Sequence, residues 1–170
     1  MITREVTTAD RRPLTAFLRR EFEALGYTGH RMTLANVNKL IARGVRWRIL
    51  IEDDTISAAV GSEPYDTTEG KGYTVTHLVV AKGHPDKLLA LDALALFAIN
   101  RPQSDGVKFI RATIPRPDAA DYARDHSGMA ASQPLTGEQN ILLGSPQDIL
   151  RAILARRPEW RTSLSSMTLT

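Results

Sequence analysis

The stretch from residue 73 to residue 114 constrains the fold more than any other part of the chain. It starts with YTVTHLVV (residues 73–80), an apolar and β-branched run that is typical of a buried strand. Residues 87–98 (KLLALDALALFA) are almost all helix formers, and residues 107–114 (VKFIRATI) have the pattern of a second strand. Together they form a βαβ unit, which predicts two parallel strands joined by a right-handed crossover.

The connection between the first strand and the helix reads AKGHPDK. Pro85 is expected in the first turn of the helix, where its missing N–H costs no hydrogen bond, and Asp86 complements the positive end of the helix dipole. Residues 100–102 (NRP) are expected to end the helix. In βαβ units, ligands tend to bind at the carboxyl ends of the strands, beside the helix N-terminus. Residues 81–87 are therefore the first place to look for a functional site.

The other segments add strands and helices on both sides of this unit. Strands are expected at residues 2–6, 46–52, 56–63, 129–134 and 139–143, and helices at residues 10–25, 33–44, 118–126 and from 145 onward. Asp53 and Asp54 are expected to form a hairpin turn, and residues 64–72 a mobile loop. Thr33 and Ser145 are expected to cap their helices, and Pro146 to follow at the first helical position.

Composition limits the kind of protein. A chain of 170 residues predicts one domain with a substantial core. It has no cysteine, which excludes disulfides, thiolate catalysis and cysteine-bound zinc. No apolar run is long enough for a membrane span and the first residues do not resemble a signal peptide, so a cytoplasmic protein is expected. The net charge of +3 permits an anionic partner without requiring one.

Three stretches, together with the order of the elements, resemble the GNAT-type N-acetyltransferases. They are ITREVTTADRRPLTAFLRREF (residues 2–22), LALDALALFA (89–98) and VKFIRATIPRPDAADYARDHSGM (107–129). The resemblance covers residues 2–144 and implies an α/β (α+β) fold: a mixed, mainly antiparallel sheet with a parallel βαβ core, flanked by helices. Residues 1–144 would be the GNAT-like domain. Residues 145–170 would be an added amphipathic helix and tail, packed on that domain or on a partner.

In this family the loop after the central strand reads Gln/Arg-x-x-Gly-x-Gly/Ala, and its backbone amides hold the pyrophosphate of coenzyme A. The matching residues here are KGHPDK, so Lys82 keeps a basic side chain while Pro85 and Lys87 replace the two glycines. Proline removes a donor, and Asp86 adds negative charge beside a diphosphate. If acetyl-CoA binds, the resemblance implies contacts with Val79, Val80, Lys82, Gly83, His84 and Lys87. A solvated helix cap is the alternative, and weakened rather than abolished binding of acetyl-CoA is expected.

The resemblance also implies two catalytic groups. The tyrosine that protonates the leaving thiolate aligns with Arg124, whereas Tyr122 lies two residues away, about 200° round a helix. His77, on the strand before the loop, is the candidate general base, because an unperturbed imidazole can deprotonate an amine near neutral pH. Glu63 and Glu69 are further candidates for the base. The simpler alternatives are that Tyr122 packs on the sheet, that His77 is a half-buried, hydrogen-bonded strand residue, and that the glutamates are solvated.

Other functions have little support in the sequence. The four histidines are too widely spaced for a helical metal site, and neither a G-x-S-x-G nor a Walker sequence occurs, so no metal is expected. Acidic residues interleave with basic ones and aromatic residues make up 6%, which argues against nucleic-acid binding. The last helix has an Ile/Leu face opposite Arg151, Arg156 and Arg157. This amphipathic pattern predicts that the helix mediates docking or oligomerisation.

Two hypotheses follow from the altered loop. In the favoured one, the chain has a GNAT-like fold with degenerate cofactor binding and serves a structural, assembly or protein-interaction role. In the alternative, it is an acetyl-CoA-dependent N-acyltransferase in which an amine attacks the acyl group directly, with His77 as base and Lys82 binding phosphate. Fold alone does not separate the two.

Overall fold

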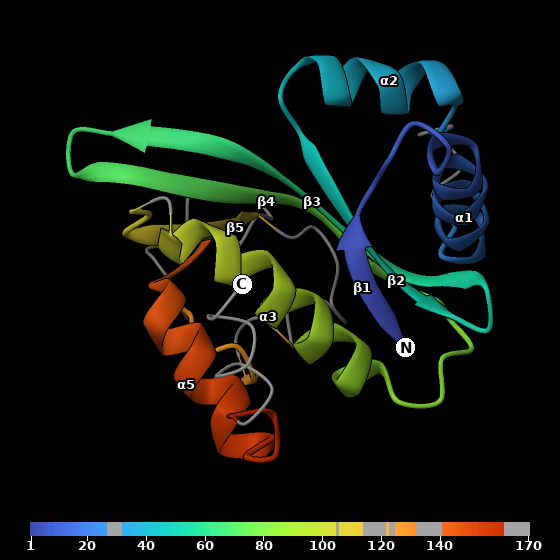
Figure 1. Cartoon of the computed structure of the whole chain (residues 1–170). Coiled ribbons are helices and arrows are strands. Elements are labelled where there is room, and N and C mark those ends of the chain that lie inside the picture. Colours follow the sequence, from blue (N-terminus) through green and yellow to red (C-terminus); the bar gives the residue numbers. More distant parts are fainter. Residues whose placement is uncertain (27–31, 105, 114–121, 123–124, 132–140, 162–170) are drawn as a thin grey trace.

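The described part of the chain folds into one mixed sheet with helices on both faces (Figure 1). The computed structural model describes residues 1–26, 32–104, 106–113, 122, 125–131 and 141–161. The strands are β1 (Ile2–Glu5), β2 (Arg46–Glu52), β3 (Thr55–Thr67), β4 (Gly70–Val80), β5 (Phe109–Thr113), β6 (Ala130–Ala131) and β7 (Ile141–Gly144). The helices are α1 (Arg11–Ala24), α2 (Leu34–Ala42), α3 (Lys87–Ser104) and α5 (Pro146–Arg156).

The seven strands lie in the order β1-β2-β3-β4-β5-β7-β6. Of the described strand pairs, β4 and β5 alone are parallel, and α3 connects them. The prediction of a mainly antiparallel sheet with a parallel βαβ core is therefore confirmed.

Apolar side chains fill both spaces between the sheet and its helices. On one face α1 and α2 bury Leu18 and Val37 against Trp47 of β2. On the other face α3 and α5 bury Leu94 and Ile153 against the middle of the sheet. Figure 1 shows the two helical layers on opposite sides of the strands. The sheet is thus covered by helices on both sides, and its strand ends remain as the places where a ligand could reach it directly.

Both predicted helix caps are confirmed. The hydroxyl of Thr33 accepts a hydrogen bond from the amide of Asn36 at 3.2 Å. The hydroxyl of Ser145 accepts from the amide of Asp148 at 3.1 Å, with Pro146 next in the chain. Each cap satisfies one of the amides that the first helical turn leaves without a partner.

The prediction of a mobile loop at residues 64–72 is wrong. β3 continues to Thr67 and β4 begins at Gly70, so the two strands form one long hairpin (Figure 1). The Tyr65 ring lies edge-on to Phe109 at 6.0 Å, and the Arg111 guanidinium lies 3.8 Å from the Tyr65 centroid. These contacts across the sheet order a segment whose turn-forming residues alone suggested a loop.

The predicted end of the central helix is also wrong. Residues 100–102 were expected to stop it, yet α3 runs to Ser104. A proline removes only the bond to the carbonyl four residues earlier, and near the last turn this loss does not end the helix.

The turn at Asp53 and Asp54 is confirmed, and its type is now defined. Both residues have positive φ, 46° and 57° respectively. This conformation is that of a type I′ turn, whose twist matches that of the two flanking strands. Aspartate tolerates it because its short polar side chain can bond locally.

The helix predicted at residues 118–126 lies largely outside the described residues. Tyr122 and Asp125 are helical, and the amide of His126 donates to the carbonyl of Tyr122 at 2.9 Å. The two weak strand predictions correspond to β6 and β7, which pair with each other.

Asp10 gives a prediction for the pH dependence of stability. Its carboxylate accepts from Arg4 at 2.7 Å and from the amide of Thr7, also at 2.7 Å, and the Arg4 hydrogen bond holds its pKa well below the usual range. A carboxyl group whose pKa is lower in the folded state contributes its full stabilisation at pH values above its unfolded-state pKa. This contribution is lost as the pH falls from the unfolded-state pKa through the folded-state pKa. Asp10→Asn is expected to cost about 1.5–3 kcal/mol at pH 7 and to flatten the acid limb of the stability curve. Urea unfolding from pH 7 to pH 2 tests this, with the exposed Asp66→Asn as control; equal acid limbs in wild type and Asp10→Asn would contradict it.

Candidate active site

β4 and β5 separate at the carboxyl end of the βαβ unit. In the described part of the chain their parallel pairing reaches Val75 and Ala112, whereas β4 continues for five residues to Val80. In that part β4 pairs with β3 on its other side, with Val79 opposite Ala59. The gap that opens between two parallel strands is where an α/β sheet most often binds a ligand. Val79 and Val80, both predicted to contact a cofactor, lie on the open part of β4.

A β-bulge sets the direction of His77. The pairing of β3 with β4 passes from Ser62–Val75 to Gly61–His77, so that Thr76 is one extra residue on β4. The Thr76 hydroxyl donates to the carbonyl of Gly61 at 3.1 Å and lies 2.9 Å from His77 Nδ1. The His77 ring lies 5.0 Å from Trp47, on the face covered by α1 and α2. His77 is therefore half-buried and hydrogen-bonded, and it lies beside the strand gap.

The loop after β4 already holds a carboxylate. The amide of Lys82 donates to Glu21 Oε2 at 2.8 Å, and Glu21 of α1 is 3% exposed. This amide of the loop therefore already has an acceptor within the protein. The side chains of Lys82 and Lys87 are exposed, as is Gly83.

His84 turns inward from the same loop. Its Nε2 lies 2.7 Å from Glu52 Oε2, and its side chain is 6% exposed. The amide of Asp86 donates to His84 Nδ1 at 3.1 Å, so Nε2 carries the proton given to Glu52. Hydrogen bonds from Ser57 and then from His84 lower the pKa of Glu52. The His84 side chain thus fixes the loop to Glu52 at the end of β2 and does not point outward to solvent.

Asp86 caps α3 with its own side chain. Its carboxylate accepts from the amide of Leu89 at 2.8 Å. The second negative charge of this region therefore sits at the helix N-terminus, where the dipole favours an anion. Two amides at this strand–helix connection, those of Lys82 and Leu89, thus donate to carboxylates of the protein.

Tyr122 is buried against α3 and donates its hydroxyl proton to Asp92 at 2.9 Å. Asp92 is 0% exposed and also accepts from Arg156 at 2.7 Å and from Arg157 at 3.3 Å. Burial, with the neighbouring charge of Asp92, raises the pKa of Tyr122 far above its ordinary value. The phenol is thus held neutral as the donor of a structural hydrogen bond.

The same cluster corrects the prediction for the last helix. Arg156 and Arg157 were expected on a basic outer face, yet both turn toward α3 and Asp92. Arg151 does face solvent, with a side chain that is 79% exposed. The Ile149 and Ile153 side chains pack in the core of this chain.

Sequence reasoning missed Glu21, Asp92 and the roles of the two arginines. Asp92 did carry a signal, because it is the one charged residue within the run LLALDALALFA and a buried charge needs a partner. Glu21 carried a weaker signal, because it follows Leu14 by seven positions and Leu18 by three and so lies on the apolar face of α1, whereas Glu23 does not. Of the other candidate bases, Glu63 forms an ion pair with Arg43 at 3.2 Å, and Glu69 lies in the exposed hairpin turn.

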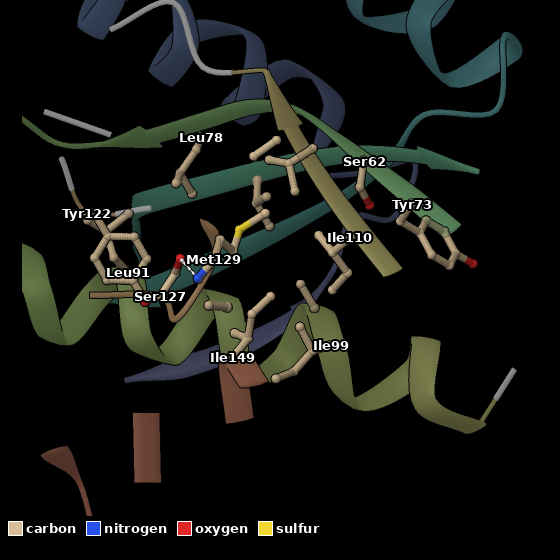
Figure 2. A pocket seen from close by; sticks show the side chains of 15 residues that line it. Ser62, Tyr73, Leu78, Leu91, Ile99, Ile110, Tyr122, Ser127, Met129 and Ile149 are labelled. Atoms are coloured by element: carbon tan, nitrogen blue, oxygen red, sulfur yellow. Dashed lines mark hydrogen bonds between the residues drawn. The ribbon is translucent and has the colours of Figure 1, made fainter. Parts of the chain in front are cut away.

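An apolar cavity of about 70 Å³ lies between the sheet and α3 (Figure 2). Val75 and Leu78 of β4, Ala112 of β5 and Ala98 of α3 are among its lining residues, and Tyr122 closes one end. Since Val75 and Ala112 form the last parallel pair, the cavity begins where the two strands separate. In the described ranges, no cluster of histidine and carboxylate side chains could bind a metal ion, and no helix is long and apolar enough to cross a membrane.

Comparison with known proteins identifies the fold. The sequence matches no family model and no curated protein. An aminoglycoside 6'-acetyltransferase type Ii superimposes with a TM-score of 0.70 at 16% identity, over 86% of this chain and 97% of that one. PaiA N-acetyltransferase from Thermoplasma acidophilum, in complex with coenzyme A, superimposes with a TM-score of 0.68 at 12% identity, over 85% of this chain and 98% of that one. The GNAT family N-acetyltransferase YhbS from Escherichia coli, in complex with CoA, superimposes with a TM-score of 0.61 at 18% identity, over 89% of this chain and 83% of that one.

These similarities rest on the arrangement of the elements, since the sequences are almost unrelated. They extend over 83–98% of the length of the three acetyltransferases compared, and coenzyme A is bound in two of them. The chain therefore has the fold of the GNAT-type N-acetyltransferases.

Proposed function

We propose that this chain is a GNAT-fold protein that has lost acetyl-CoA binding and acts through contact with other proteins. The observation that carries the proposal is the hydrogen bond from the Lys82 amide to the buried Glu21 carboxylate, at 2.8 Å. A phosphate would have to displace this carboxylate to reach the amide. It would also meet the charge of Asp86 at the start of α3.

Electrostatics explain why this exchange is unfavourable. Two like charges 4 Å apart near a protein surface repel by about 4 kcal/mol. Lys82 and Lys87 offset part of this repulsion, but both are exposed and their charges are screened by water and salt. Pro85 has no N–H to offer in place of the amide that Glu21 occupies.

The state of Tyr122 supports the same conclusion. A general acid must release its proton near neutral pH, whereas the Tyr122 proton is held by Asp92 in a buried cluster. If the chain has no acid and no phosphate loop, its fold serves as a scaffold, and its outer surfaces carry the function. The outward face of α5, which bears Arg151, is one surface through which we propose a partner or a second copy docks.

A second candidate function is an N-acyltransferase, and the strand gap favours it. β4 runs on beyond Val75 without β5 beside it in the described residues, and His77 lies beside the opening with its ring near the uncharged Trp47. In this alternative His77 takes a proton from an amine, and the loop opens when coenzyme A arrives. Two of the similar structures hold coenzyme A in the same fold.

Titration with acetyl-CoA separates the two functions. Wild-type protein is expected to show neither heat of binding nor a shift in melting temperature at micromolar to millimolar acetyl-CoA. A bound ligand at 100 times its Kd would stabilise the fold by about 2.7 kcal/mol, which a melt resolves easily. Micromolar binding to wild type would overturn the proposal and would justify a search for an amine substrate, with His77→Ala as the test of the base.

Glu21→Gln tests whether the buried carboxylate is the cause. The variant keeps the size of the side chain and removes its charge, so binding of acetyl-CoA is expected to become measurable in the concentration range where wild type shows none. Glu23→Gln, two residues on in α1 and exposed, is the matched control and should leave binding absent. Equal results for the two variants would show that Glu21 does not block the loop.

A further inference from the structure

Four side chains form a patch on the face of the sheet opposite α3. Ile110 and Ala112 line the cavity on the α3 side, and side chains alternate along a strand, so Arg111 between them lies on the other face. Leu143 of β7 is paired with Arg111 and shares that face. The rings of Tyr65 and Phe109 also lie there, because Tyr65 contacts both Arg111 and Phe109. We call Tyr65, Phe109, Arg111 and Leu143 the hairpin patch.

The hairpin patch lies away from the helices on its side of the sheet. The apolar residues beneath α1 and α2 include Trp47 and Ile49 of β2 and Val79 near the end of β4; in the described ranges, none belongs to the hairpin patch. Figure 1 shows the β3–β4 hairpin extending away from α1 and α2. Leu143 is 39% exposed, although β7 has a strand on either side of it. An apolar side chain so exposed on an inner strand indicates that this face of the sheet is open to a partner.

The guanidinium of Arg111 is held in place before any partner binds. It lies 3.8 Å from the centroid of the Tyr65 ring, and its Nε donates to the hydroxyl of Thr74 at 3.2 Å. Phe109 supports the Tyr65 ring edge-on, with 6.0 Å between the centroids. Among the described residues no carboxylate pairs with Arg111, so its two terminal amino groups keep their donors for a ligand. Because the side chain is already ordered, binding costs it little conformational entropy.

The chemistry of the hairpin patch favours one carboxylate between apolar groups. The terminal amino groups of a guanidinium match both oxygens of a carboxylate. Tyrosine and arginine are among the residues that most often dominate the binding energy of protein interfaces. A nucleic acid fits less well, because it needs several cations and would meet the carboxylate of Glu63, two residues before Tyr65 on the same face.

We propose that the hairpin patch binds an acidic segment of a protein partner. One aspartate or glutamate of the segment pairs with Arg111, and apolar side chains beside it pack on Leu143 and Tyr65. The inference rests on the proposed role in protein contact. It adds a surface on the opposite face of the sheet from α5 and names the chemistry of the partner.

Two blocked tripeptides test the charge requirement. Ac-Leu-Asp-Leu-NH2 and Ac-Leu-Asn-Leu-NH2 are titrated into isotope-labelled wild-type protein and followed by NMR. The aspartate peptide is expected to bind at least fivefold more tightly and to shift the Nε–H signal of Arg111. Equal affinity for the two peptides, or no binding at about 10 mM peptide, would overturn the proposal. Tighter binding of a short oligothymidylate than of the aspartate peptide would also overturn it, in favour of a nucleic-acid surface.

Leu143→Glu tests the location with little risk to the fold, because Leu143 is exposed. The new carboxylate lies opposite Arg111 on the neighbouring strand, where the two side chains can pair. It should occupy the guanidinium and weaken binding of the aspartate peptide at least fivefold. Leu25→Glu adds the same charge at a residue of matching exposure, 38% against 39%, and should leave binding intact. The same affinity in both variants would exclude the hairpin patch.

Arg111→Gln tests the guanidinium itself. The ratio between the affinities of the two peptides should fall to about one, because no group is left to distinguish aspartate from asparagine. Arg46→Gln removes the same charge from an exposed strand position and should keep the ratio of wild type. A ratio that survives in Arg111→Gln would contradict the assignment. No probe here resembles coenzyme A, so failure of these tests would leave the loss of acetyl-CoA binding as proposed, and binding of acetyl-CoA would leave their outcome unchanged.

Discussion

Asp92→Asn is expected to lower the free energy of unfolding by about 3–5 kcal/mol, the largest loss foreseen for a near-isosteric change in this protein. The side chain is completely buried, and it accepts from Tyr122, Arg156 and Arg157. Asparagine removes the negative charge and leaves two guanidinium groups, both largely buried, facing a neutral amide. Breaking one side of a buried ion pair costs more than the pair itself contributes, because the remaining charge stays desolvated.

Urea unfolding followed by circular dichroism measures this loss. Arg151→Gln is the control, since Arg151 is 79% exposed and its pair with Asp148 spans only three residues of α5. Exposed helical pairs of this type contribute little to stability, so this variant should unfold almost as wild type does. A loss below 1 kcal/mol for Asp92→Asn would show that the cluster does not hold α5 on α3.

Gly128→Ala is expected to destabilise the fold by about 2–4 kcal/mol, for two separate reasons. Gly128 has a φ of +74°, a left-handed conformation that costs any residue with a Cβ about 1–2 kcal/mol. A Cβ here would also lie 2.9 Å from the carbonyl oxygen of Asp148, which belongs to the rigid first turn of α5. Backbone cannot move aside as a flexible side chain can, so the overlap adds about 1–3 kcal/mol.

Two other glycines separate the cost of the left-handed backbone from the cost of steric overlap in the same unfolding experiment. Gly26 has a φ of +77°, but no atom of the described residues lies within 4 Å of an added methyl group, so Gly26→Ala should show the backbone cost alone. Gly83 has open space and no positive φ, so Gly83→Ala should be nearly neutral. If Gly128→Ala lost no more stability than Gly26→Ala, contact with α5 would not matter at this position.

Local sequence signals accounted for most of the fold. Thr33 and Ser145 marked helix starts because their side chains bond amides only three residues away, and the apolar runs of β4 and α3 defined the parallel unit. The prediction of a loop at residues 64–72 was wrong because this segment depends on contacts with distant residues. Tyr65 is ordered by contacts with Phe109 and Arg111, which come more than forty positions later in the chain. The residues next to Tyr65 in the sequence give no indication of these contacts.

The candidate site shows the same limit more strongly. Its position after β4 followed from the βαβ pattern, and Pro85 in the loop pointed to a weak phosphate site. The residue that occupies the Lys82 amide lies 61 positions earlier, and the arginine that neutralises Asp92 lies 64 positions later. Such pairs form only when the layers on the two faces of the sheet assemble, so one sequence alone could not reveal that Glu21 and Arg156 are part of the site.

The extra residue at Thr76 makes one position of this strand tolerant of a change in length. Side chains alternate between the two faces of a strand, and a shift of one position normally exchanges them. Thr76 is the unpaired residue of the bulge, with Val75 opposite Ser62 and His77 opposite Gly61. A single-codon deletion at Thr76 would therefore leave these pairs in place, with His77 on the side of Trp47 and Leu78 in the cavity lining, and would remove only the hydroxyl that bonds the Gly61 carbonyl. Random libraries built on this scaffold should accept a deletion at Thr76 more readily than at a paired position of β4.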